Sequence, residues 1–182
     1  MERRAVIVLA LAWASLDPTT GLDAARHAQE PATFLADAFG GSAPAAGVMA
    51  LDAAQRQAAS DILGHPPDTA RVRYWCRDTR CAFVLDEIAH AYPITAGIVV
   101  DAGRIEWARV LMYRESRGAE VTRTSFLVQL EGRALTATRT LDAPIDGITG
   151  ATQSVAAMTR IARLALYLAD QLAHAQEPGD GR

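Results

Sequence analysis

Hydrophobic residues near the C-terminus recur at spacings of three and four positions. The residues that follow this rule are Val155, Met158, Ile161, Leu164, Ala165, Leu168 and Leu172. Such spacing places them on one face of a helix with 3.6 residues per turn. The charged residues Arg160, Arg163 and Asp170 fall on the other faces. The pattern predicts a long amphipathic helix that begins close to Thr152 and packs one face against a core.

The middle of the chain alternates with a period of two. Four runs have the character of β-strands: 71–76, 81–86, 94–100 and 105–113. A polar loop, 77–80, separates the first two runs, and Asp101-Ala102-Gly103 separates the last two as a typical hairpin turn. Because the gaps are too short for crossover helices, we expect these strands to be antiparallel.

Shorter helices are predicted on both sides of the strands, over 34–39, 52–63 and 124–130. In the second, Asp52 and Gln55 have the spacing of a capping box, and Gly64 follows the last turn. The segment 136–145 is expected to run extended into the long helix. The sequence therefore predicts an α+β fold. A twisted antiparallel sheet or half-barrel of hairpins packs with a long C-terminal helix and a shorter N-terminal helix.

The N-terminus has the character of an export signal. Arg3 and Arg4 precede an uncharged apolar run over 5–16, which is too short to span a bilayer comfortably. Cleavage after Ala12-Trp13-Ala14 or within 24–28 are both open, as are a retained anchor and a buried helix. With 15–33 as a linker, the expected organisation is a signal or N-terminal segment (1–28), one domain (33–175) and a flexible tail (176–182).

Composition and charge exclude several classes of function. Lys and Arg number 18 against 21 Asp and Glu, so no basic surplus exists to bind nucleic acid. The four histidines have no metal-ligand spacing, no serine–histidine–aspartate order is visible, and no metal site is expected. Cys76 and Cys81 flank a hairpin loop; a disulfide between them and two free thiols are both open.

The chemistry of the chain is expected in the turn before the long helix, where the sequence is Asp146-Gly147-Ile148-Thr149-Gly150-Ala151-Thr152. Flexible glycines, threonine hydroxyls and the unpaired N–H groups of a helix start suit a phosphate group. The lysine of a P-loop is missing. By spacing alone, a helix start of this kind is most often only a cap.

The pattern Asp-x-x-Thr-Gly-Ala-Thr resembles the flavinylation motif of the FMN-binding domain family. That family includes the flavin-carrying subunits of the sodium-pumping NADH:quinone reductase and of the Rnf complex. The resemblance, over about residues 34–172, implies that the phosphate of FMN is esterified to Thr152 by a flavin transferase with FAD as donor. It also implies a cofactor-binding role for the rest of the turn: Asp146, Thr149, Gly150 and Ala151.

A second segment carries the resemblance. Residues 113–118 stand where the better-known subunits have Glu-Thr-Pro-Gly, a loop that forms part of the flavin site. Glu115, Ser116 and Gly118 are therefore candidate flavin neighbours, and Arg117 replaces the proline. Taken alone, Glu115 would be a solvated loop charge, and Asp146 would cap the turn.

The expected function is electron transfer rather than stand-alone catalysis, with no catalytic residue assigned. An exported domain with covalent FMN would relay electrons between other molecules, such as a membrane or periplasmic redox partner. Two other classes of function stay open: a non-redox binding or regulatory module of the same fold, and a flavin-dependent reductase of a small molecule.

Overall fold

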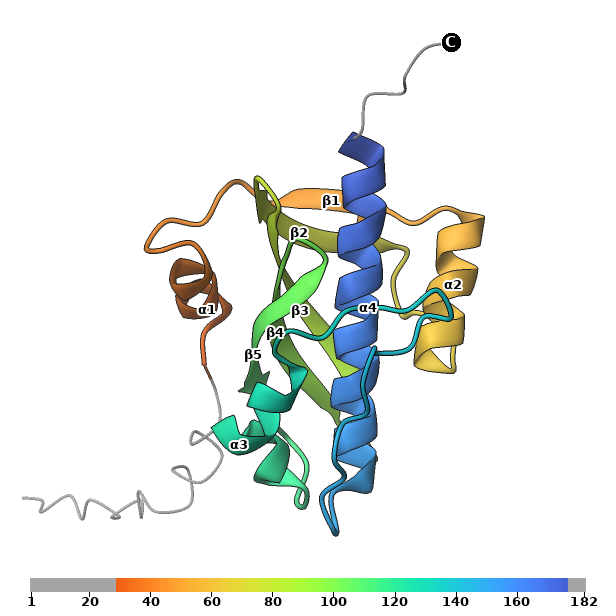
Figure 1. The fold of residues 1–182 in the computed structure, drawn as a ribbon. Coiled ribbons are helices and arrows are strands. Elements are labelled where there is room, and N and C mark those ends of the chain that lie inside the picture. Colours follow the sequence, from red (N-terminus) through yellow and green to blue (C-terminus); the bar gives the residue numbers. More distant parts are fainter. Residues whose placement is uncertain (1–28, 177–182) are drawn as a thin grey trace, which may run out of the picture.

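The computed structural model describes residues 29–176, and Figure 1 shows its fold. The predicted signal segment and the predicted tail beyond Gln176 lie outside the described residues. One antiparallel sheet has its strands in chain order: β1 (Gly47–Ala50), β2 (Arg71–Arg77), β3 (Arg80–Ile88), β4 (Pro93–Asp101) and β5 (Arg104–Met112). This open sheet and the helices around it confirm the predicted α+β class.

Tight turns join the strands where the alternating pattern indicated hairpins. The β4–β5 turn has Ala102 at φ 46° and Gly103 at φ 75°. Left-handed backbone at both central positions matches the right-handed twist of paired strands. The β2–β3 connection is shorter than the expected loop, because Arg77 and Arg80 pair with each other and only Asp78 and Thr79 lie between the strands.

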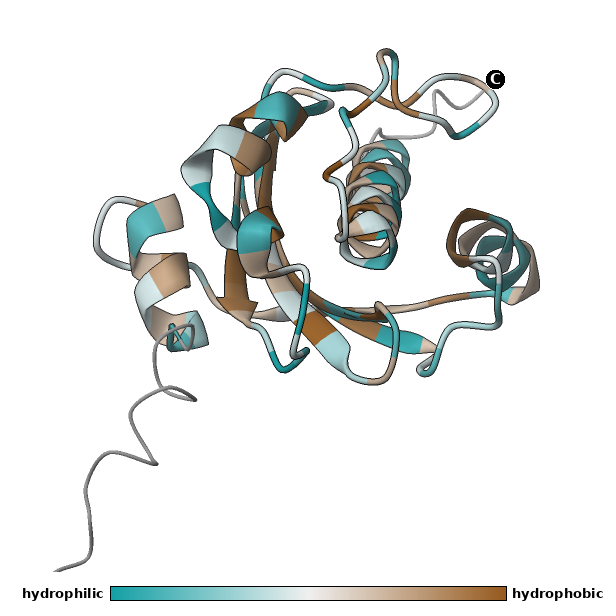
Figure 2. Cartoon of the chain, turned by 90° about the horizontal axis from the view of Figure 1, so that it is seen from below, coloured by the Kyte–Doolittle hydropathy of each residue, from teal (hydrophilic) through white to brown (hydrophobic). Residues whose placement is uncertain are grey.

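The helices lie on both faces of the sheet. They are α1 (Pro31–Ala38), α2 (Ala53–Leu63), α3 (Thr124–Leu127) and α4 (Thr152–Gln176), with short 3-10 turns η2 (Ala119–Thr122) and η3 (Val128–Leu130) beside α3. The sheet curves around α4, while α1 lies against the opposite face (Figure 2). None of the helices within 29–176 combines the length and apolar character needed to cross a membrane.

Two hydrophobic clusters fill the spaces on the two faces. The larger joins α4 to the concave side of the sheet, and all seven apolar residues predicted for the helix face are buried in it. The smaller surrounds Phe34 of α1, whose ring lies against Gly97 of β4. A side chain at position 97 would overlap that ring. The central strands are covered on both faces. Residues that point away from α4, such as Ala82, Val99 and Leu111, are therefore also buried, in the smaller cluster.

The start and end of α2 follow the sequence prediction. The N–H of Gln55 donates to Asp52 Oδ1 at 2.8 Å, and the N–H of Asp52 donates to Gln55 Oε1 at 3.0 Å. Gly64 ends the helix in the left-handed conformation, at φ 81°. The capping box is confirmed, and α2 packs against α4.

Three segments differ from the prediction. β1 was not predicted, because its four residues are too few for a clear period; it forms by pairing with β2, where Tyr74 covers Gly47. α1 begins at Pro31, inside the expected linker. Residues 136–145 do not run extended: Leu135 pairs with Leu141, and the Thr136 N–H donates to the Thr140 carbonyl, so the chain reverses direction.

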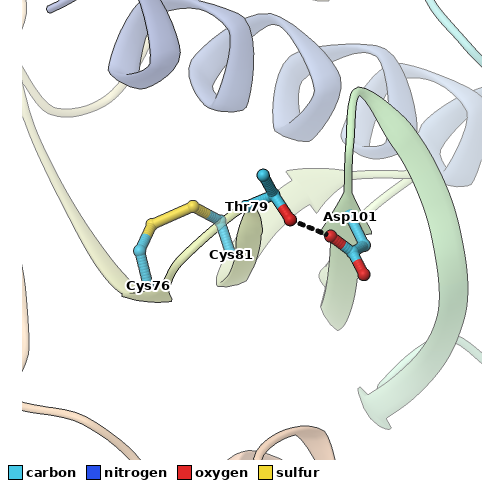
Figure 3. The surroundings of a disulfide bond; sticks show 4 residues. All are labelled: Cys76, Thr79, Cys81 and Asp101. Carbon is cyan, nitrogen blue, oxygen red and sulfur yellow. Dashed lines mark hydrogen bonds between the residues drawn. A yellow bond between two sulfur atoms is a disulfide. The ribbon is translucent and has the colours of Figure 1, made fainter. Parts of the chain in front are cut away.

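Cys76 and Cys81 form a disulfide across the β2–β3 hairpin (Figure 3). They are directly paired in the sheet register, which places their Cα atoms 4.1 Å apart. The Thr79 hydroxyl donates to Asp101 Oδ1 at 2.6 Å and so joins this turn to the β4–β5 turn. The disulfide resolves the two alternatives that the sequence left open.

Replacing both cysteines with alanine should lower the free energy of unfolding by about 2 kcal/mol, the loop-closure effect for so short a loop. Urea unfolding of the variant, and of the wild type with and without reductant, measures the change. An unchanged midpoint in all three samples would contradict the prediction.

Candidate functional site

The turn that precedes α4 and the loop that follows β5 line one open cleft at the start of α4. Its volume is about 480 Å³. The residues that line it are His90, Glu115, Ser116, Arg117, Gly150, Ala151, Thr152, Gln153 and Ser154. The structure therefore brings two segments together that lie more than thirty positions apart in the sequence.

Thr152 is the first residue of α4, and it is exposed in the cleft. Gly150, at φ 83°, turns the chain just before it, and Ala151 is buried beneath. Val155 is the first residue whose N–H donates within this end of the helix, to the Ala151 carbonyl. Within residues 29–176, the N–H groups of the three preceding residues, 152–154, have no acceptor.

The hydrogen bond by which a threonine hydroxyl was expected to cap α4 is not present among residues 29–176. Ala151 occupies the position before the helix, and no threonine side chain accepts a hydrogen bond from the first turn in the described part of the chain. The N–H groups that a cap would satisfy remain available at the positive end of the helix dipole. This arrangement suits an anion more than it suits a closed helix cap.

The opposite wall of the cleft is tied to α4 through Tyr113 and Ser154. Their hydroxyls lie 2.9 Å apart, and the Tyr113 hydroxyl also donates to the Arg117 carbonyl. Burial is the main cause that raises the pKa of Tyr113. Gly118 passes behind this contact at φ 85°, and a Cβ there would lie 2.5 Å from Ser154 Oγ. Only glycine fits this close approach without displacing the helix.

Glu115 lines the cleft, and its carboxylate is bound by backbone N–H groups rather than by solvent alone. Its Oε1 accepts hydrogen bonds from the N–H groups of His90, Ala91 and Tyr92, at 2.9, 2.7 and 2.8 Å. The carboxylate thereby holds the β3–β4 turn and places His90 at the cleft. The hydrogen bond from Tyr92 is the largest of the causes that lower the pKa of Glu115.

The order of the β3–β4 turn should depend on pH. Because the pKa of Glu115 is lowered in the folded protein, its contribution is present above the usual glutamate pKa and is lost as the pH falls through the folded value. Amide exchange of residues 90–92, followed by NMR and divided by the intrinsic exchange rate at each pH, should therefore show less protection in acid. Glu115→Gln should exchange faster at neutral pH and lose most of this dependence; a variant with the same pH profile as the wild type would contradict the assignment.

The remaining predicted residues lie outside the cleft lining. Thr149 is exposed, and Asp146 is exposed with a carboxylate that makes no hydrogen bond or ion pair with another residue between 29 and 176. Asp146 therefore does not cap the turn as expected; instead its N–H donates to Gln129 Oε1 at 2.8 Å. Gly118 supports the cleft from behind, as described above.

Sequence reasoning did not assign five contributors to the site, which are His90, Tyr113, Arg117, Gln153 and Ser154. Tyr113 and Ser154 each lie two positions from a predicted residue, but only their contact reveals their role. His90 reaches the cleft through the β3–β4 turn, and Arg117 was noted only as a replacement for proline. A polar residue at a buried position of a helix, as Ser154 is, was the one available signal.

A larger cavity lies at the other end of α4, between the two hairpin turns and the second half of the helix. Its volume is about 740 Å³, and Cys81, Arg139, Tyr167 and Asp170 are among its lining residues. None of the residues predicted to bind the cofactor lines it. Within 29–176, no group of histidine, cysteine and acidic side chains could hold a metal ion.

Residues 90–167 match the family model of the FMN-binding domain. The match supports an FMN-binding domain in this part of the chain, and with it the binding of a flavin. The match includes both walls of the cleft but is shorter than the expected resemblance over 34–172. Comparison with curated proteins and with solved structures gives no match.

The cleft fits the phosphate end of FMN. It offers the exposed Thr152 hydroxyl, three N–H groups at the start of a long helix and the guanidinium of Arg117. The hydroxyl, the N–H groups and the guanidinium can all donate hydrogen bonds to phosphate oxygens, and the guanidinium also carries a positive charge.

Proposed function

We propose that FMN is joined to Thr152 by a phosphoester and that the protein relays electrons outside the cytoplasm. The observation that carries the proposal is the position of Thr152. Its hydroxyl is exposed in the cleft at the first turn of α4, beside N–H groups that have no acceptor within 29–176. The hydroxyl is thus accessible to a modifying enzyme, and a phosphate attached to it would lie at the positive end of the helix.

The attachment requires a flavin transferase and FAD. A bond forms between Thr152 Oγ and the phosphorus on the riboflavin side of FAD, the bond between the two phosphates breaks, and AMP leaves. The hydroxyl proton passes to the transferase or to water. Asp146 lies six positions before Thr152 in the sequence and is exposed. Its carboxylate has no hydrogen-bond or ion-pair partner among the described residues and is available to contact the transferase.

The protein's own groups would position the cofactor, which supplies the electron-accepting and electron-donating chemistry when bound. The amides at the start of α4 hold the phosphate, while Glu115 and Ser116 border the rest of the cleft. Glu115 also keeps the β3–β4 turn at the cleft wall. Because the cleft is open to solvent, redox partners can approach it, which favours a relay over a closed substrate site.

Two observations support a place outside the cytoplasm. The first is the Cys76–Cys81 disulfide, since such bonds persist mainly in oxidising compartments. The second is the signal-like sequence that begins at Arg3. A covalent bond would retain the cofactor where loss by diffusion is otherwise expected. The electron donor and acceptor are then a membrane or periplasmic redox partner.

Intact mass after unfolding tests the covalent bond. Protein co-expressed with a flavin transferase should gain the mass of one FMN less one water, stay yellow in denaturant, and carry the adduct on the peptide that contains Thr152. Protein expressed without the transferase is the control and should have the mass of its amino acids. Equal masses for the two samples would overturn the proposal.

The relay is tested with membranes. The loaded, reduced protein should be reoxidised faster by membranes from its natural host than by small-molecule acceptors. Rapid turnover of a small molecule without any membrane would instead favour a stand-alone reductase.

A further inference from the structure

The cleft contains few charged groups, and they differ in how many hydrogen bonds their side chains make. Glu115 and Arg117 are the only acidic or arginine side chains among its lining residues. The Glu115 carboxylate already accepts three N–H groups. The guanidinium of Arg117 makes no hydrogen bond or ion pair with any other residue between 29 and 176. Its positive charge is therefore not balanced within the described part of the site.

The backbone of Arg117 is held in place even though its side chain is exposed. The Tyr113 hydroxyl donates to its carbonyl, and the same hydroxyl contacts Ser154 in the first turn of α4. This link ties residue 117 to the helix start that carries Thr152. Other arginines near the cleft are placed differently: Arg114 donates to the Pro93 carbonyl, and Arg123 lines a separate pocket.

We propose that Arg117 is the residue that makes this site select a flavin with a phosphate over a flavin without one. Arg117 lines the cleft from the loop after β5 and residues 152–154 line it from the start of α4, so the guanidinium and the free N–H groups would bind phosphate oxygens together. Guanidinium matches phosphate with paired hydrogen bonds, and the helix start adds its partial positive charge. The inference rests on the flavin site of the proposed function but not on the covalent bond.

Binding of FMN and of riboflavin to the unloaded protein tests the assignment, because riboflavin differs only by the missing phosphate. The full chain is expressed without a transferase, and the dissociation constants are measured by quenching of flavin fluorescence. Wild type should bind FMN at least about tenfold more tightly than riboflavin, the range of a hydrogen bond to a charged group. Arg117→Gln should remove most of this preference, and Arg117→Lys should keep part of it.

Arg56→Gln is the matched control. Arg56 is exposed on α2, its side chain makes no hydrogen bond or ion pair with a residue between 29 and 176, and the substitution makes the same change in net charge. It should leave the preference for FMN unchanged. The melting temperature of Arg117→Gln should equal that of the wild type, because its side chain is not part of the fold.

Equal affinity of the wild type for the two flavins, or no measurable binding of FMN, would overturn the proposal. An unchanged preference in Arg117→Gln would do the same. A failure of covalent attachment is distinguishable, since it appears only as an unchanged mass in the transferase experiment and leaves the comparison of FMN with riboflavin intact.

Discussion

Thr152→Val should lose all flavin on unfolding, whereas Thr152→Ser should keep it, when each is co-expressed with a flavin transferase. Valine has the shape of threonine but no oxygen to bond to phosphorus, and serine restores the oxygen. Absorbance in denaturant and intact mass measure the retained flavin. The effect is expected to be all or none, because a phosphoester either forms or does not.

The substitution should leave the fold intact. The Thr152 hydroxyl makes no hydrogen bond with other residues in 29–176, and the side chain is exposed at the first position of the helix. Surface changes of this kind alter the free energy of unfolding by no more than about 0.5 kcal/mol. Urea unfolding of the unloaded variants provides the control. A yellow adduct of full yield in Thr152→Val would mean that another residue carries the flavin.

Glu87→Ala should produce the largest loss of stability of the variants considered. The Glu87 side chain is 2% exposed, and its Oε1 accepts from Arg160 Nε at 2.7 Å. His65 Nε2 lies 3.2 Å from the same carboxylate. These contacts join β3, α4 and the segment after α2. Removal of the carboxylate leaves the mostly buried Arg160 guanidinium with the Ile88 carbonyl but without an opposite charge, which is expected to lower the free energy of unfolding by about 3 kcal/mol.

Glu106→Ala is the matched control for this prediction. Glu106 accepts from Arg80 at 2.8 Å, but both side chains are more than one third exposed. Because solvent screens such pairs, the loss should be below about 1 kcal/mol. Urea unfolding of both variants under one condition gives the comparison. Losses of equal size would show that the burial of Glu87 does not govern its contribution.

Local patterns predicted most of the elements. The three- and four-residue spacing identified the buried face of α4, and the alternation around Asp101-Ala102-Gly103 identified the β4–β5 hairpin. The capping box of α2 was also visible, because both partners lie within one helical turn. Each of these features depends on residues close together in the chain, and a single sequence contains that information.

Patterns failed where pairing partners are distant or segments are short. The strand β1 has four residues and gains its hydrogen bonds from β2, more than twenty positions later. The reversal over 136–145 depends on contacts among threonines and on Arg139 at φ 59°, neither of which has a distinctive period. No local rule would have identified them.

The sequence by itself determined the flavin motif, the helix that follows it and the residue at which attachment is proposed. Only the tertiary structure decided what surrounds that residue. It placed the Glu115 carboxylate on the N–H groups of the β3–β4 turn and left the charge of Arg117 unpaired within 29–176. The physical reason is that a motif is a property of neighbours in the chain. The charge balance of a cleft depends instead on which distant groups the fold brings within hydrogen-bonding distance.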